Sequence, residues 1–307
     1  MKKSRTEQII EKIEDLPALP KAVNDLIAVM ENPDSTVNNM VQAMDTSICA
    51  KILRIANSAF YRGLREVRSI EHAIAVLGRD TIRDLVLGLS IIKMFKKKGD
   101  ETFDYEKFWS RSVISSLIAK MFGQLTSNPD LSKLYTIGLI HDMGEIVFFS
   151  YFPEEYKKVL SIMQRDNVRL SEAEERIFGI SHPVVGGLLA ERWKLPKDIV
   201  RIITYHEDPH KLKDNLDELR LGMIIHSADI LANELVETVS CDQLFGDEDR
   251  LELLFSGVSV QAVNLMKDIL ADSIDSAIVD DWTRRIENEL VIVSRAISPI
   301  MATLLTG

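Results

Sequence analysis

The sequence is poor in the two residues that turns use most. It contains 14 Gly and 9 Pro in 307 residues, which is about 7.5% of the chain against roughly 12% in an average protein. A β-sandwich, barrel or propeller needs many tight turns, and turns rely on Gly and Pro. The composition therefore disfavours these folds, together with collagen-like and proline-rich disordered chains.

Cysteines and long apolar runs are scarce as well. Cys49 and Cys241 form no CxxC pair, so the sequence contains neither a zinc-ribbon motif nor a dithiol redox motif. The apolar stretch around residues 85–92 is interrupted by Lys93 and is shorter than the ~20 residues that span a bilayer. The N-terminus has no apolar run of signal-peptide length. We therefore expect a cytoplasmic protein without a membrane partner.

The net charge of −10 is unevenly distributed. Residues 1–99 carry 16 Lys and Arg against 12 Asp and Glu, a net of +4, and the remainder carries 21 against 35, a net of −14. This asymmetry indicates two subdomains that meet near residue 100. The densest basic run, residues 96–98, contains no aromatic residue, and the whole chain is acidic. Nucleic acid is therefore not an expected partner.

Helical periodicity dominates the apolar pattern. Apolar residues recur three and four positions apart along most of the chain, and strand-like alternation never lasts more than four residues, so we predict an all-α protein. One predicted helix spans Leu131–Tyr151 and contains the doublet His141-Asp142. Ser171 and Glu174 have the spacing of a capping box and are expected to begin a shorter helix.

Several histidines and acids lie in apolar surroundings. The doublet His141-Asp142 and the later Asp229 each lie in an apolar segment, while His182 begins one predicted helix and His206 ends the next. A buried charge is costly unless it is paired or binds a metal. Imidazole and carboxylate together suit a divalent ion such as Zn, Mn, Fe or Mg. The spacings are too long to be diagnostic of a metal site, and a hydrogen-bonded polar network is the favoured interpretation.

The order of these residues resembles the HD superfamily of helical metal-dependent phosphohydrolases, and residues 14–240 are similar to its HDOD branch (HD-related output domain). The similarity rests on these segments: Leu16–Pro20, Asn57–Tyr61, Gly138–Asp142, His182–Gly186 and Trp193–Pro196. The resemblance implies a bacterial signalling module, commonly without known catalysis. It implies a smaller N-terminal helical subdomain (1–99), an HD-like helical subdomain (100–240) and a helical extension (241–307) packed on the HD-like part.

The sequence departs from the active HD enzymes at two positions. Where they carry their first histidine ligand, the resemblance places Arg111, and arginine has no lone pair to give a metal. Where the cyclic-dinucleotide hydrolase branch carries a lysine, this chain has Glu145, and the Gly-Tyr-Pro signature of that branch is missing after His206. The loss of the first ligand and of the lysine together argues against hydrolysis and predicts a vestigial site.

Two hypotheses follow for the vestigial site. In the first, the planar guanidinium of Arg111 pairs with Asp142 or Asp229 and balances their charge, so that no metal or other cofactor is expected. In the second, one divalent metal is still held, and its ligands are His141, Asp142, His182, His206 and Asp229.

Two functions remain open on this evidence. The departures favour a non-catalytic signalling module that contacts other signalling proteins, or binds a nucleotide or other anion at the vestigial site. The alternative is a metal-dependent phosphohydrolase or phosphodiesterase acting on a nucleotide or phosphate ester. A homodimer contact through the C-terminal helices is a further open alternative. Asn57 and Ser58 are interpreted as structural, because Asn at a helix end can cap backbone groups, with ligand binding as the alternative.

Overall fold

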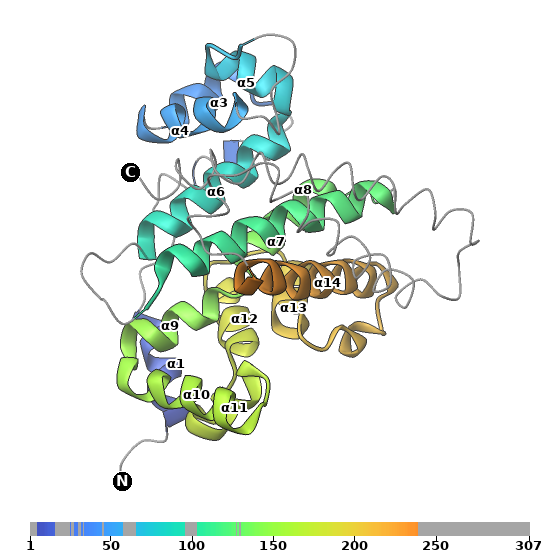
Figure 1. Cartoon of the computed structure of the whole chain (residues 1–307). Helices are drawn as coiled ribbons and strands as arrows, with labels where there is room; N and C mark the ends of the chain where they lie inside the picture. The colour runs from blue at the N-terminus through green and yellow to red at the C-terminus, as the bar shows by residue number, and fades with distance from the viewer. Residues whose placement is uncertain are drawn as a thin grey trace. The chain divides into compact units, whose positions relative to one another are not determined.

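The computed structural model describes residues 5–15, 25, 28–29, 32, 34–44, 46–57, 66–95, 103–126, 128 and 130–238 (Figure 1). All regular elements in these ranges are helices, which confirms the all-α prediction. The predicted extension 241–307, as well as Ser58, lies outside the described residues. Within the described ranges, no helix is both long and apolar enough to cross a membrane.

The chain folds into two compact units, and each of them combines segments that are far apart in the sequence. Unit 1 consists of residues 1–18, 97–104 and 140–226, and unit 2 of residues 19–96, 105–139 and 227–307. Subdomain boundaries near residues 100 and 240 stay a prediction.

The described part of unit 2 contains short helices, the longer helices α6 and α7, and part of α14. Its first four described helices are α3 (Val37–Ala43), α4 (Thr46–Ala56), α5 (Ile70–Leu77) and α6 (Arg79–Phe95). They are followed by α7 (Tyr105–Leu125), α8 (Leu131–Ile140) and the second half of α14 (Leu216–Thr238). Local capping begins two of them. Thr36 and Asn39 form a reciprocal capping box before α3, and the Ser69 side chain accepts from the backbone N–H of His72 before α5.

Unit 1 contains the helices that carry most of the candidate residues. They are α1 (Arg5–Asp15), α9 (Met143–Tyr151), α10 (Pro153–Asp166), α11 (Leu170–Phe178), α12 (His182–Arg192), α13 (Lys197–Tyr205) and the 3₁₀ turn η1 (Pro209–Leu212). In this unit α12 packs against α9 and α13, and α1 packs against α9 and α12 (Figure 1). The fully buried rings of Phe148 and Phe178 stack in parallel at 4.4 Å in its core.

Helices α9 and α12 approach so closely that only glycine fits between them. A Cβ added to Gly144 would lie 2.0 Å from the carbonyl oxygen of His182 and 2.7 Å from the backbone nitrogen of Gly186. Both obstacles are backbone atoms, which cannot rotate away as a side chain can. This contact places the first turn of α12 directly against the segment that carries Asp142.

The prediction of one helix over Leu131–Tyr151 is wrong. Helix α8 ends at Ile140 and α9 begins at Met143, so the His141-Asp142 doublet forms the turn between them. Asp142 has φ −90° and ψ 8°, outside the helical region. Every residue from 134 to 149 is buried, so the apolar pattern continues through the turn and gives no sign of it.

The predicted capping box at Ser171 and Glu174 is also wrong. Helix α11 begins at Leu170, with Arg169 as the N-cap residue and no side-chain cap. The Ser171 hydroxyl donates to Glu207 instead, and Glu174 accepts hydrogen bonds from His182. The two side chains that could have capped the helix therefore form hydrogen bonds with residues of later segments instead.

Candidate metal site

Four of the predicted site residues come together inside unit 1. His141 and Asp142 occupy the turn before α9, His182 is the first residue of α12, and His206 follows the last residue of α13. The packing of α12 against both α9 and α13 brings the four side chains together. All four are buried, with 0% exposure for His141 and His206 and 3% for Asp142 and His182.

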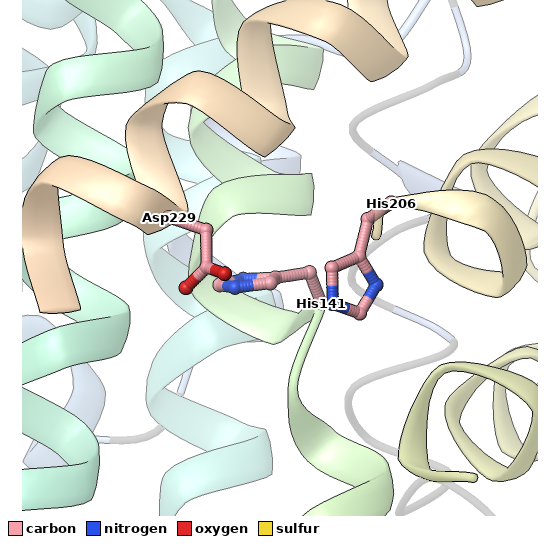
Figure 2. Close-up of side chains that lie close together, drawn as sticks. All are labelled: His141, His206 and Asp229. Carbon is pink, nitrogen blue, oxygen red and sulfur yellow. The ribbon is translucent and has the colours of Figure 1, made fainter. Parts of the chain in front are cut away.

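Three imidazole nitrogens converge on the Asp142 carboxylate. The Nε2 atom of His141 lies 3.3 Å from Oδ2, while the Nε2 atoms of His182 and His206 lie 3.4 Å and 3.3 Å from Oδ1. The rings of His141 and His206 meet edge to face, and their centroids are 4.9 Å apart; both side chains are labelled in Figure 2. We call Asp142, His182 and His206 the HDH cluster, because their ligand atoms all lie within 4.8 Å of one another.

Each histidine of the HDH cluster is oriented from behind by an acceptor. The Nδ1 atom of His182 lies 2.7 Å from Glu174 Oε2, which also accepts from the His182 backbone N–H at 2.7 Å. The Nδ1 atom of His206 lies 2.8 Å from the carbonyl oxygen of Ile203. A carbonyl only accepts, so Nδ1 carries the hydrogen, and the Nε2 atom of the neutral ring keeps its lone pair. This is how proteins orient histidines that bind metals.

Burial and pairing shift the acidities of Glu174 and His182. Burial raises the pKa of Glu174 to about 7, although the charge of His182 and its hydrogen bonds act in the opposite direction. Burial alone would lower the pKa of His182, but the carboxylates of Glu174 and Asp142 together outweigh it and hold that pKa well above its usual value. In the metal-free protein His182 is therefore an imidazolium between two acids.

The distances in the HDH cluster fit a bound cation. Zinc takes nitrogen and oxygen ligands at about 2.0–2.2 Å, which puts neighbouring ligand atoms of a tetrahedron roughly 3.3–3.6 Å apart. The observed separations from Asp142 Oδ1 to the two Nε2 atoms, 3.4 and 3.3 Å, fall in this range. Two imidazoles with one carboxylate suit Zn, Mn or Fe better than Mg, which prefers oxygen ligands. Asp142, His182 and His206 would hold such an ion, which would supply the positive charge between them.

The charge around the HDH cluster also favours a cation over an anion. Asp142, Glu145 and Glu174 are buried in this part of unit 1, and Glu207 lies 3.6 Å from the Nε2 atom of His182. One imidazolium offsets part of this negative charge. A nucleotide or phosphate would therefore be repelled here unless a cation were bound first.

The remaining predicted residues belong to other helices and have contacts of their own. Glu145, in the first turn of α9, accepts a hydrogen bond from the Tyr156 hydroxyl at 3.0 Å. Arg111 belongs to α7 in unit 2, where its guanidinium carbon lies 5.5 Å from the centroid of the Phe108 ring. Asp229, also labelled in Figure 2, is carried by the unit 2 part of α14 and accepts from Asn233 Nδ2 at 2.9 Å. The pairing of Arg111 with a carboxylate stays a prediction.

Asn57 holds a loop in unit 2. Its Nδ2 atom donates to the carbonyl oxygens of Leu53 at 2.9 Å and Val67 at 2.7 Å, and its Oδ1 atom accepts from the Val67 N–H at 2.8 Å. These bonds tie the end of α4 to the segment before α5. A shallow depression of about 650 Å³ lies beside it. The amide thus makes three hydrogen bonds to the backbone, and whether Asn57 also binds a ligand stays open.

Sequence reasoning missed Glu174 as a residue of the site. Its signal was its position: Glu174 and Phe178 are one turn apart on the buried face of α11, and both side chains are buried. An acid on the apolar face of an amphipathic helix requires a partner. That partner, His182, comes from the next helix, and the sequence pattern does not indicate which residue it is.

Residues 16–209 match the model of the HDOD domain family, and the chain belongs to this family. An uncharacterized protein of Treponema pallidum (strain Nichols) is 25% identical over 206 residues, or 66% of this chain. The chain spans only 40% of the length of that relative.

Solved structures share the fold at low sequence identity. An HDOD domain protein of unknown function from Geobacter sulfurreducens has a TM-score of 0.69 at 23% identity, and a candidate phosphohydrolase from Shewanella amazonensis SB2B has 0.67 at 22%. Each comparison covers 94% of this chain and 97% of the other. A candidate signal transduction protein from Marinobacter aquaeolei VT8 has 0.61 at 22% identity, over 97% of this chain and 62% of the other. These likenesses establish the HD-like all-α fold.

Proposed function

We propose that this chain is a signal-transduction module whose HD-like site binds one divalent metal ion through the HDH cluster and does not hydrolyse phosphate esters. The observation that carries the proposal is the convergence of the His182 and His206 Nε2 atoms on Asp142 Oδ1, at 3.4 and 3.3 Å. Because both rings are oriented by acceptors at Nδ1, little reorganisation is needed to bind an ion.

Two residues support a role without turnover. The resemblance places Arg111 where active HD enzymes have their first histidine ligand, and a guanidinium does not bind metals. Glu145 stands where the cyclic-dinucleotide hydrolase branch has a lysine, and it is held by Tyr156 at 3.0 Å. The resemblance therefore implies a site without the first metal ligand and the phosphate-binding group that hydrolysis in this family would use.

A bound ion would serve as a signal by joining separate segments of unit 1. Its ligands come from the turn before α9, the start of α12 and the end of α13. Binding stabilises the folded state by about 2.7 kcal/mol when the free metal is a hundredfold above its dissociation constant. Partner proteins that contact this unit would then meet a more rigid surface in the metal-bound state.

A metal-dependent phosphohydrolase is the second candidate. The same donors favour it, since a divalent ion with an open coordination position lowers the pKa of bound water and makes it a nucleophile. The two functions share the ion and differ only in turnover.

Metal titration with an activity assay separates the alternatives. Protein stripped with EDTA is titrated with Zn²⁺, Mn²⁺, Fe²⁺ and Mg²⁺ while thermal unfolding is followed, in the wild type, D142N, H206A and the control H210A. His210 is an exposed histidine four residues after His206. We expect metal to raise the Tm of the wild type and H210A, and of neither site variant.

The same samples are assayed with bis-(p-nitrophenyl) phosphate and cyclic dinucleotides, and we expect no hydrolysis. A wild type that binds none of the four metals would overturn the proposal. Hydrolysis that needs metal and is lost in D142N would establish the second candidate in its place.

A further inference from the structure

Glu207 lies at the rim of the HDH cluster, and its position allows more than a contribution of negative charge. It follows His206 directly, beyond the end of α13. Its Oε1 atom lies 3.6 Å from the Nε2 atom of His182, the atom that would face the ion. Its side chain is 21% exposed, while that of Asp142 is 4% exposed. The side chain of Glu207 therefore lies between the buried cluster and the protein surface.

Two residues at the start of α11 hold the other oxygen of Glu207. The Ser171 hydroxyl donates to Oε2, and the Nη1 atom of Arg169 lies 3.7 Å from the same atom. Oε1 is thereby left on the side of His182. The carboxylate thus has one oxygen held by the rim and the other directed toward the cluster.

The HDH cluster itself is incomplete as a metal site. It supplies three ligand atoms, whereas zinc bound by imidazole and carboxylate is almost always at least four-coordinate. The Nε2 atom of His206 is fully buried, faces Asp142 and makes no hydrogen bond to the described part of the chain. A buried imidazole nitrogen directed at a carboxylate without a hydrogen bond indicates that a ligand belongs between them.

We propose that Glu207 is the fourth protein ligand of this ion, an inference that rests on the proposed function. The Oε1 atom of Glu207 lies 3.6 Å from the Nε2 atom of His182, at the upper end of the range expected for neighbouring ligands of one tetrahedral ion. Glu207 lies outside the group of ligand atoms that are all within 4.8 Å of one another, so its carboxylate has to turn toward Asp142 and His206 when the ion binds. Asp142, His182, His206 and Glu207 would then complete the coordination within unit 1 alone. Ser171 and Arg169 position Glu207 from behind, as Glu174 positions His182.

The test compares E207Q with D208N in the full chain. Glutamine preserves the size of the side chain and its contact with Ser171 but removes the charge. Asp208, the next residue, has a half-exposed side chain that forms an ion pair with Lys211 at 3.2 Å. D208N therefore removes a neighbouring charge and serves as the matched control. Zn²⁺ affinity is measured by calorimetry, and the visible absorption of the Co²⁺-loaded proteins reports the coordination geometry.

We expect E207Q to bind Zn²⁺ at least tenfold more weakly than the wild type and to show an altered Co²⁺ spectrum, while D208N matches the wild type in both. A wild type that binds no metal refutes the proposed function itself. Equal affinities for the wild type and E207Q refute only the role of Glu207. Weaker binding with an unchanged Co²⁺ spectrum also refutes it, because Glu207 would then act through its charge and not as a ligand.

Discussion

Glu174 offers the sharpest test of how the HDH cluster is built. The carboxylate is completely buried, and a single oxygen accepts both the backbone N–H and the Nδ1–H of His182, each at 2.7 Å. E174Q preserves the volume but removes the charge that fixes the ring. Loss of a contact of this kind typically lowers metal affinity 10–100-fold, which corresponds to about 1.4–2.7 kcal/mol of binding free energy.

The measurement is the Zn²⁺ dissociation constant of wild type, E174Q and E175Q by calorimetry. Glu175 is the exposed neighbour on the same helix, so E175Q controls for the lost charge without changing the contact to His182. We expect E175Q to bind as the wild type does. Equal affinity in all three proteins would refute the claim that Glu174 orients His182 for an ion.

The same variant changes the pH dependence of the metal-free protein. The folded-state pKa values of Glu174 and His182 are both raised, to about 7 and to well above the usual value. At these two groups the folded protein therefore binds more protons than the unfolded chain, and their contribution to the free energy of unfolding falls as the pH rises through the raised pKa values. The contribution of His182 to the free energy of unfolding is fully present below its unfolded pKa of about 6.5. It is lost as the pH rises through the higher folded pKa.

Urea unfolding in EDTA at pH 5.5 and pH 8 measures this effect. We expect a lower free energy of unfolding at pH 8, and a smaller difference between the two pH values in E174Q, which lacks the carboxylate that raises the pKa of His182. A saturating metal should reverse the trend, because it competes with protons for the same ligands. A wild type whose metal-free stability increases toward pH 8 would contradict the assigned shifts.

Two further predictions concern close packing and loop anchoring. G144A should lower the free energy of unfolding by about 2 kcal/mol or more, because the new Cβ would lie 2.0 Å from the His182 carbonyl oxygen. G186A should cost less, since its nearest obstacle is a side-chain methyl group at 3.0 Å; urea unfolding of both variants checks the order. N57A should lower the free energy of unfolding by about 1–3 kcal/mol, because it leaves the N–H and C=O of Val67 without their bonds to the amide. The Zn²⁺ affinity of N57A should equal that of the wild type.

Local helix signals were only partly reliable. The Ser69 hydroxyl accepts from the backbone three residues on, because such a cap depends only on neighbouring residues. The Ser171–Glu174 pair has equally good spacing, yet both side chains bond to residues of later segments, Glu207 and His182. A short-range pattern predicts a cap only where no distant partner competes for the same atoms.

The sequence by itself determined the helical class, the HDOD family and the identity of His141, Asp142, His182 and His206 as candidates, because periodicity and motif order are properties of the chain. Only the tertiary structure decided that the doublet lies in a turn, that the two later histidines face Asp142 Oδ1 at 3.4 and 3.3 Å, and that Glu174 lies behind one of them. These relations depend on how α9, α11, α12 and α13 pack, and above all on a backbone contact at Gly144 that excludes any side chain.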